Sequence, residues 1–178
     1  MEYLRRTDRK LVKKCHIFDL YEDTVVSPTG HVAKWDFLKH NGAAAILPVT
    51  DDGKILMVRQ YRNSIDGVSL EIPAGKKDTP EEPSYDCAAR ELEEETGYRC
   101  DRLEFLVHLV TAVAYCDEQI DIYVARNLQP SRQHLDEDEF LSLEAFDVET
   151  LREMAFNGTL TDAKTVAAVM AYCQKYGK

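Results

Sequence analysis

The first part of the chain alternates between apolar and polar residues in a way that predicts antiparallel β-strands. Between residues 15 and 39 the alternation is nearly regular, and it is broken only at 27–30, where Ser-Pro-Thr-Gly is typical of a turn. We therefore expect two antiparallel strands joined by that turn. A second hairpin is predicted within 43–62, because Asp52 and Gly53 separate a buried apolar run from another strand-like segment.

The rest of the chain mixes short strand-like segments with segments of helical periodicity. A strand is expected at 68–72, and a helix from about Pro80 to Thr96, because Gly97 follows it as a C-terminal stop. The other expected elements are strands at 103–112 and 120–125, an acidic loop at 133–140, and helices at 148–156 and 161–176. Early hairpins followed by interspersed helices favour an α/β fold with a mixed β-sheet flanked by helices.

Composition and charge are those of a soluble globular protein. The chain has 178 residues, of which 44% are hydrophobic and 30% charged, unlike disordered or collagen-like chains. Its net charge of −10 would repel a polyanion, so we do not expect nucleic acid as a partner. No stretch is apolar over the roughly 18 residues of a membrane-spanning helix, and the basic N-terminal segment lacks the apolar run of a secretory signal. We therefore expect a cytoplasmic protein with no membrane partner.

The segment 75–98 carries the side chains with the clearest chemistry. At about 100° per residue, Glu91, Glu94 and Glu95 share one face of the predicted helix. Arg90 can relieve the repulsion at Glu94, four residues on, which leaves Glu91 and Glu95 as the pair most in need of a cation. Their hard oxygens suit Mg²⁺ or Mn²⁺, which bind phosphate oxygens as well. The pattern indicates a metal site for a phosphorylated small molecule, and a solvated acidic helix face is the alternative interpretation.

This segment resembles the box of the Nudix hydrolase family, which reads Gly, five residues, Glu, seven residues, then Arg-Glu-aliphatic-x-Glu-Glu-x-Gly and an aliphatic or aromatic residue. The matching residues are Gly75, Arg90, Glu91, Leu92, Glu94, Glu95, Gly97 and Tyr98. The remaining Glu is either Glu81, which has the family's spacing from Gly75, or Glu82, which has its spacing to Arg90. A structural alternative for Glu82 is a capping box with Pro80 at the first helical position.

The flanks of the box resemble the ADP-ribose pyrophosphatase branch of the family. The segments that carry this resemblance are 55–62, 70–75, 117–118, 136–139 and 162–165. The branch implies the Nudix fold, with a mixed β-sheet sandwiched between α-helices and an N-terminal antiparallel β-hairpin extension. It implies an extension at 1–40, which exchanges strands in a homodimer, and a hydrolase domain at 41–178. The implied reaction is the Mg²⁺-dependent hydrolysis of the pyrophosphate of ADP-ribose, or of a related nucleoside diphosphate sugar, to AMP and ribose 5-phosphate.

The resemblance also implies a role for individual residues. The implied ligands of Mg²⁺, or of Mn²⁺ in its place, are the Ala74 carbonyl oxygen, Glu91, Glu95 and Glu139. The implied substrate contacts are Arg62 to the pyrophosphate, Trp35 stacked on adenine, and Glu71 and Glu118 along the pocket. The implied catalytic residues are Arg90 and Glu94 of the box and Glu137 as the general base, with Glu139 as the other candidate for the base.

One departure from the branch leaves the substrate open. Members often have Ser-Pro-Gly before the Asp-Glu pair, whereas this chain has Ala-Val-Ala-Tyr-Cys at 112–116 before Asp117 and Glu118. The alternatives are a pyrophosphatase for GDP-mannose or another sugar nucleotide, and a Nudix module that binds a nucleotide without cleaving it.

Overall fold

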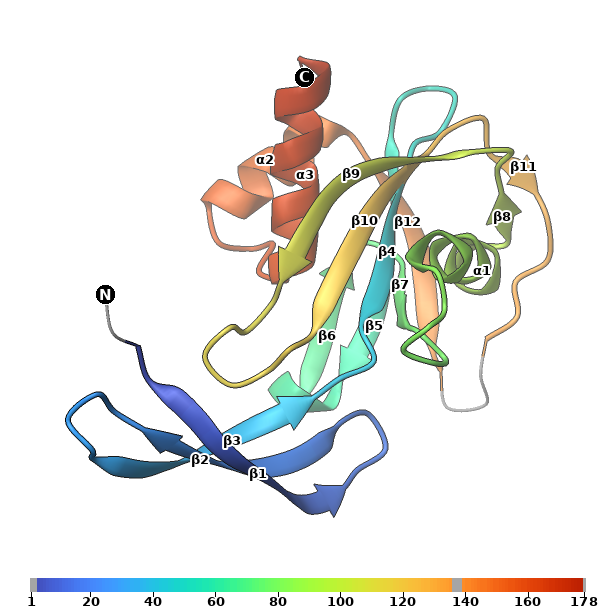
Figure 1. The fold of residues 1–178 in the computed structure, drawn as a ribbon. Helices are drawn as coiled ribbons and strands as arrows, with labels where there is room; N and C mark the ends of the chain where they lie inside the picture. Colours follow the sequence, from blue (N-terminus) through green and yellow to red (C-terminus); the bar gives the residue numbers. More distant parts are fainter. Residues whose placement is uncertain (1–2, 136–138, 178) are drawn as a thin grey trace. The chain divides into compact units, whose positions relative to one another are not determined.

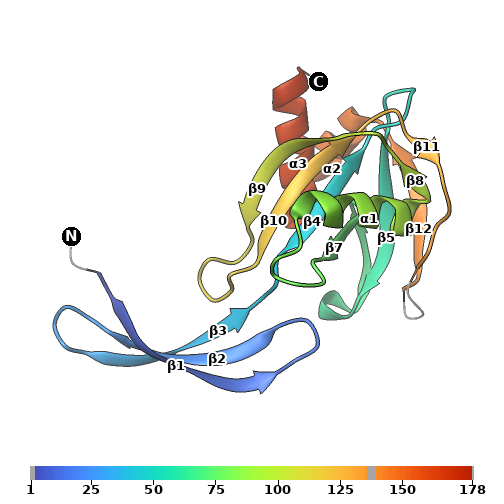
Figure 2. The ribbon, with the colours of Figure 1, turned by 45° about the vertical axis from the view of Figure 1, so that its right-hand side comes forward.

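The computed structural model describes residues 3–135 and 139–177 and divides into two compact units. The first unit contains the residues up to Gly42 together with Val110–Gln119, and the second contains Ala43–Leu109 and the residues from Ile120 onward. The path of the chain through each unit is shown in Figures 1 and 2. No helix in the described part of the chain is long and apolar enough to cross a membrane.

The first unit is built on three antiparallel strands in the order β1-β2-β3. They are β1 (Arg5–Lys14), β2 (Asp19–Val26) and β3 (Val32–Lys39). The predicted pair of strands is confirmed as β2 and β3, but the predicted hairpin extension is a three-stranded sheet. Strand β1 escaped prediction because nearly all its residues are exposed and show no alternation. Cross-strand charge pairs hold it instead, as Arg9 donates two hydrogen bonds of 2.6 Å to Asp23 of β2.

The second unit contains a mixed four-stranded sheet in the order β7-β4-β10-β9, in which β4 pairs in parallel with β10 and antiparallel with β7. An antiparallel sheet of order β12-β5-β6 and the short pair β11-β8 complete it. The strands are β4 (Ala43–Pro48), β5 (Ile55–Arg62), β6 (Gly67–Glu71), β7 (Ala74–Lys76), β8 (Tyr98–Arg99), β9 (Leu103–Val110), β10 (Gln119–Ala125), β11 (Gln129–Pro130) and β12 (Leu141–Phe146). The helices are α1 (Ser84–Thr96), α2 (Val148–Phe156), α3 (Ala163–Tyr176) and the 3₁₀ turn η1 (Asn63–Ile65).

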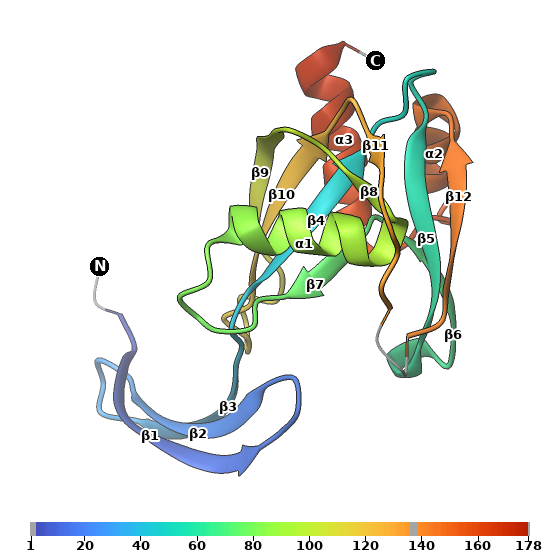
Figure 3. The ribbon, with the colours of Figure 1, turned by 90° about the vertical axis from the view of Figure 1, so that its right-hand side faces the viewer.

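Strand β4 is buried on both faces, which explains its continuous apolar sequence. Ala44 and Ile46 pack with the buried residues of α1, whereas Ala45 and Leu47 pack with those of α2 and α3. Figure 3 shows α1 on one side of the sheet and α3 on the other. The predicted sheet between helices is therefore confirmed, and α1 is fixed against β4 and β7, where the box residues lie.

Two predicted features differ from the structure. The helix expected from Pro80 begins at Ser84, because Pro83 lacks an amide hydrogen and disfavours helical backbone in the residue before it. The capping-box interpretation of Glu82 is therefore wrong: its carboxylate accepts a hydrogen bond of 2.7 Å from the Asp78 amide within the loop. The acidic loop is followed by β12, which was not predicted.

Candidate functional site

Two glutamates of α1 are buried against the first residues of β7. The exposed fraction is 8% for Glu91 and 2% for Glu95. The Ala74 amide donates a hydrogen bond of 3.2 Å to Glu95 Oε2. Gly75 lies so close to Glu91 that a Cβ atom there would overlap the carboxylate. The glycine at the start of the box therefore provides the space into which Glu91 fits.

Arg90 is the cation around which the box carboxylates gather. Its Nη1 donates hydrogen bonds of 3.0 Å to Glu94 and 2.6 Å to Glu91, and its Nη2 donates one of 3.4 Å to Glu82. The predicted pair with Glu94 is confirmed, but the expectation that Arg90 leaves Glu91 without a partner is wrong. Glu82 thus contacts Arg90 as well as the Asp78 amide of the loop. Arg90 thus relieves one side of the acidic cluster, away from Glu95.

Glu95 and Glu91 lie where negative charge is costly without a cation. Burial, together with the charges of Glu91 and Glu139, raises the pKa of Glu95 to about 8. Burial also raises the pKa of Glu91 to about 7, although Arg90 opposes the rise and Glu139 adds to it. A cation bound between these carboxylates would favour their ionised forms. The cluster therefore has the electrostatic character of a metal site.

The donor set fits a hard divalent cation that retains part of its water. Within residues 3–135 and 139–177, no three His, Cys, Asp or Glu side chains are grouped closely enough to hold a metal by themselves. The site therefore offers the Glu91 and Glu95 carboxylates, with backbone oxygen or water as further ligands. Magnesium binds in this way, through one or two carboxylates and several waters.

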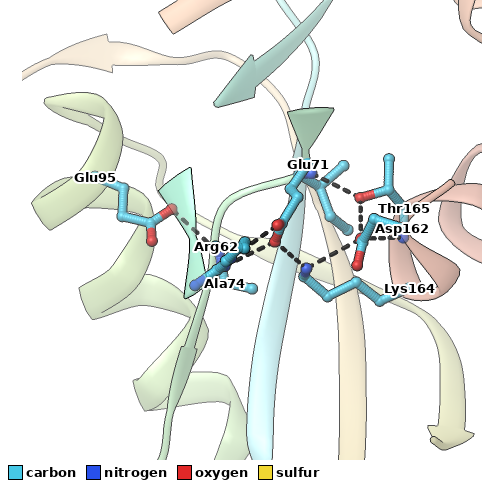
Figure 4. A network of polar contacts seen from close by, with 8 residues as sticks. Arg62, Glu71, Ala74, Glu95, Asp162, Lys164 and Thr165 are labelled. Atoms are coloured by element: carbon cyan, nitrogen blue, oxygen red, sulfur yellow. Dashed lines mark hydrogen bonds and ion pairs between the residues drawn. The ribbon is translucent and has the colours of Figure 1, made fainter. Parts of the chain in front are cut away.

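Arg62 and Glu71 form a second polar group, in which Glu71 is buried and Arg62 is partly exposed (Figure 4). Arg62 donates Nε and Nη2 to the two carboxylate oxygens of Glu71, at 2.8 and 2.7 Å, and Lys164 bonds to the same carboxylate. Glu71 is only 3% exposed. Burial alone would raise its pKa, but the hydrogen bonds and charges of Arg62 and Lys164 outweigh it and lower the pKa to about 2. Glu71 is therefore ionised at neutral pH.

Trp35 and Glu118 belong to the first unit. Trp35 lies on β3 opposite Asp23 and is 49% exposed, so its ring has a free surface. The Glu118 carboxylate accepts a hydrogen bond of 2.7 Å from Thr111 and lies 3.6 Å from the ring nitrogen Nε2 of His40. Glu137, the expected base, lies outside the described residues, whereas Glu139 is described and its charge acts on both Glu91 and Glu95.

The sequence did not reveal the residues at the start of α3 that support Glu71. Lys164 bonds to Glu71 and Asp162, and Asp162 caps the helix through the Thr165 amide. The local pattern Asp-Ala-Lys-Thr is a signal for a helix cap. It gives no sign of the contact between Lys164 and Glu71, which are 93 positions apart.

Comparisons with known proteins give one family model and relatives that are similar over nearly the whole chain. The NUDIX domain matches residues 39–169. A Bacillus subtilis (strain 168) protein named ADP-ribose pyrophosphatase is 38% identical over 173 residues, which cover 93% of each chain. The methanol dehydrogenase activator of Bacillus methanolicus is 38% identical over 169 residues, which cover 91% of each chain. The crystal structure of an ADP compounds hydrolase superimposes with a TM-score of 0.86 at 22% identity, over 99% of this chain and 96% of that one.

Proposed function

This chain belongs to the Nudix family, and from that premise we propose that it hydrolyses the pyrophosphate bond of ADP-ribose to AMP and ribose 5-phosphate. The observation that carries the proposal is the buried pair Glu91 and Glu95, held against the Ala74–Gly75 segment. A buried pair of carboxylates is costly to keep ionised unless a cation joins them. The relative from Bacillus subtilis, similar over nearly the whole chain, favours ADP-ribose as the substrate.

The proposed cation is Mg²⁺, with Mn²⁺ as a substitute, and its proposed ligands are Glu91, Glu95, Glu139 and the Ala74 carbonyl oxygen. When bound, the cation would neutralise and polarise the diphosphate. Glu91 and Glu95 keep that charge in place, and the hydrogen bond from the Ala74 amide fixes the direction of the Glu95 carboxylate. Arg90 donates hydrogen bonds to Glu91 and Glu94 and holds these two carboxylates in position.

The substrate contacts are proposed from the chemistry of each side chain. Arg62 would hold diphosphate oxygens, since Glu71 engages only its Nε and Nη2 and leaves Nη1 for another acceptor. Trp35 would stack on adenine, and Glu118 would lie near the terminal ribose. Glu137 is the proposed base, which takes a proton from the attacking water.

The extension at 1–40 is proposed to exchange strands in a homodimer, with the hydrolase domain at 41–178. Support comes from β1, whose hydrogen-bonding edge away from β2 has no partner strand among the described residues, and from the exposed apolar side chains of Leu11, Val12, Val32 and Trp35. Light scattering coupled to size exclusion tests this, and a monomer at micromolar concentration would contradict it. The cytoplasmic location and the absence of nucleic-acid and membrane partners stay predictions.

The substrate is tested by steady-state assays of the purified chain with ADP-ribose, GDP-mannose, dinucleotides and nucleoside triphosphates. We expect ADP-ribose to give the highest kcat/KM, with AMP and ribose 5-phosphate as products. Activity should disappear with a chelator and return with Mg²⁺. Hydrolysis of triphosphates alone would defeat the proposal. Calorimetric binding of ADP-ribose without turnover in saturating Mg²⁺ would favour a non-catalytic binding module instead.

A further inference from the structure

The Glu71 carboxylate is shared by two cations from distant parts of the chain. Arg62, at the end of β5, engages both oxygens, and Lys164, in the first turn of α3, engages Oε2. The side chains of Glu71 and Lys164 are 4% and 11% exposed, whereas that of Arg62 is 39% exposed. Glu71 and Lys164 thus form the buried side of the group, and Arg62 forms its open side.

Lys164 is itself fixed by the cap of α3. Its Nζ lies 3.0 Å from Asp162 Oδ2, which also accepts hydrogen bonds from the Thr165 amide at 3.0 Å and hydroxyl at 2.6 Å. The Thr165 hydroxyl in turn accepts a hydrogen bond of 2.9 Å from the Ile72 amide. Since Ile72 follows Glu71 directly, the first turn of α3 binds both the Glu71 carboxylate and the backbone of the next residue (Figure 4).

The charges of this group determine how strongly Arg62 attracts an anion. One carboxylate neutralises one cation, so Glu71 alone would cancel the charge of Arg62. With Lys164 and Asp162 the four side chains carry no net charge, whereas without Lys164 they would carry one negative charge beside Arg62. The exposed guanidinium acts on the metal side of the site as well, because its charge lowers the pKa of Glu95.

We propose that Lys164 is a positioning residue of the reaction, which acts through Glu71 to hold the Arg62 guanidinium in place and keep its charge available to the diphosphate. This inference rests on the proposed function, since it assigns Arg62 to the substrate. Lys164 bonds to Glu71 and Asp162, and would itself touch neither the substrate nor the metal ligands. Its effect should therefore fall on binding of substrate and transition state alike, and appear in KM more than in kcat.

The test compares Lys164→Met with Lys175→Met in steady-state hydrolysis of ADP-ribose with Mg²⁺. Lys175 is a matched control, because it lies on the same helix and loses the same charge, but its Nζ contacts Glu104 and the Phe105 carbonyl, both at 2.9 Å. We expect Lys164→Met to raise KM about tenfold and to change kcat less than about threefold. Lys175→Met should leave both constants unchanged, and Lys164→Arg should restore most of the wild-type KM.

A purely structural role would lower the melting temperature of Lys164→Met and leave KM unchanged, and that result would overturn the inference. If this variant does not fold, Lys164→Gln, which keeps a hydrogen-bond donor and loses the charge, must raise KM in the same way.

The Arg62 Nε–H signal in NMR gives a readout without substrate. Its exchange with solvent should become faster in Lys164→Met and not in Lys175→Met, and equal exchange would also overturn the inference. An inactive wild-type protein would defeat the proposed function, and the NMR comparison would still decide whether Lys164 holds Arg62.

Discussion

Gly75 and Glu91 lie so close together that a Cβ atom at Gly75 would overlap the Glu91 carboxylate. The backbone at Gly75 has no positive φ, so the glycine is required here for space and not for an unusual conformation. Because the overlapping atoms are at the end of the Glu91 side chain, that carboxylate can move away without a shift of the backbone.

The variant Gly75→Ala should therefore displace Glu91 and lower kcat by about 100-fold, since small displacements of a catalytic group cost about that much. The melting temperature should change little. Gly67→Ala is the control, because its Cβ would meet no atom closer than 3.6 Å. Steady-state kinetics and thermal unfolding of both variants check this, and a fully active Gly75→Ala would show that Glu91 does not need its present position.

Glu95→Gln should lower kcat by about a thousandfold or more, because it removes the charge of the most buried box carboxylate and no packing volume. The folded structure should persist in circular dichroism and thermal unfolding. Glu93→Gln serves as a control on the same helix, since Glu93 bonds to Ser131. Full activity of Glu95→Gln would remove the metal site from the proposal.

Glu71→Gln should change the dependence of stability on acid. The pKa of Glu71 is about 2 in the folded protein against an ordinary value of 4.5. Between these values the unfolded chain binds more protons, so this group's contribution to stability is present above pH 4.5 and is lost as the pH falls toward 2. The contribution is a few kcal/mol at most. In urea unfolding at pH 5, 4 and 3, the free energies of unfolding of wild type and Glu71→Gln should become more similar as the pH falls.

The exposed ion pair of Glu144 with Arg59 supplies the control for this measurement, because such pairs add little to stability. The difference in free energy of unfolding between wild type and Glu144→Gln should stay small at all three pH values. If the difference in free energy of unfolding between wild type and Glu71→Gln does not decrease toward pH 3, the low pKa of Glu71 is contradicted.

Arg9→Ala should weaken the first unit selectively. Arg9 pairs with buried Asp23 and lies 3.6 Å from the centroid of the Phe37 ring. Its removal leaves a buried carboxylate without its principal cation, which costs about 1–3 kcal/mol. Amide hydrogen exchange should become faster in β1, β2 and β3 and stay unchanged around α1. Lys10→Ala, an exposed position on the same strand, should have little effect in either place.

The local patterns of the sequence predicted the fold and the acidic face of the box. Each of these patterns is formed by residues close together in the sequence, so periodicity reveals it. They are the alternating segments, the Gly97 stop and the helical spacing of Glu91, Glu94 and Glu95. The predicted Nudix fold is confirmed by the comparisons and by the sheet that lies between α1 and α3. Strand β1 was missed because its stability comes from charge pairs across to β2, which leave no hydrophobic pattern.

The burial of Glu71 could not be predicted in the same way. A glutamate on a strand is ordinarily solvated, and nothing near it in the sequence shows that Lys164 will neutralise it. The contacts that carry this part of the site join positions 93 residues apart, so only the fold brings them together. Glu137, the base expected from the sequence, lies outside the described residues and stays a prediction.

The cap of α3 has a consequence for the order in which the enzyme matures on the ribosome. Every carboxylate of the box has been synthesised by residue 95, yet Glu71 acquires its second cation only when Lys164 has left the exit tunnel. A nascent chain that stops short of Asp162 would contain the complete box and lack the helix whose Lys164 contacts Glu71. The contact that neutralises Glu71 is therefore one of the last in the site to be synthesised, long after the box itself has been translated.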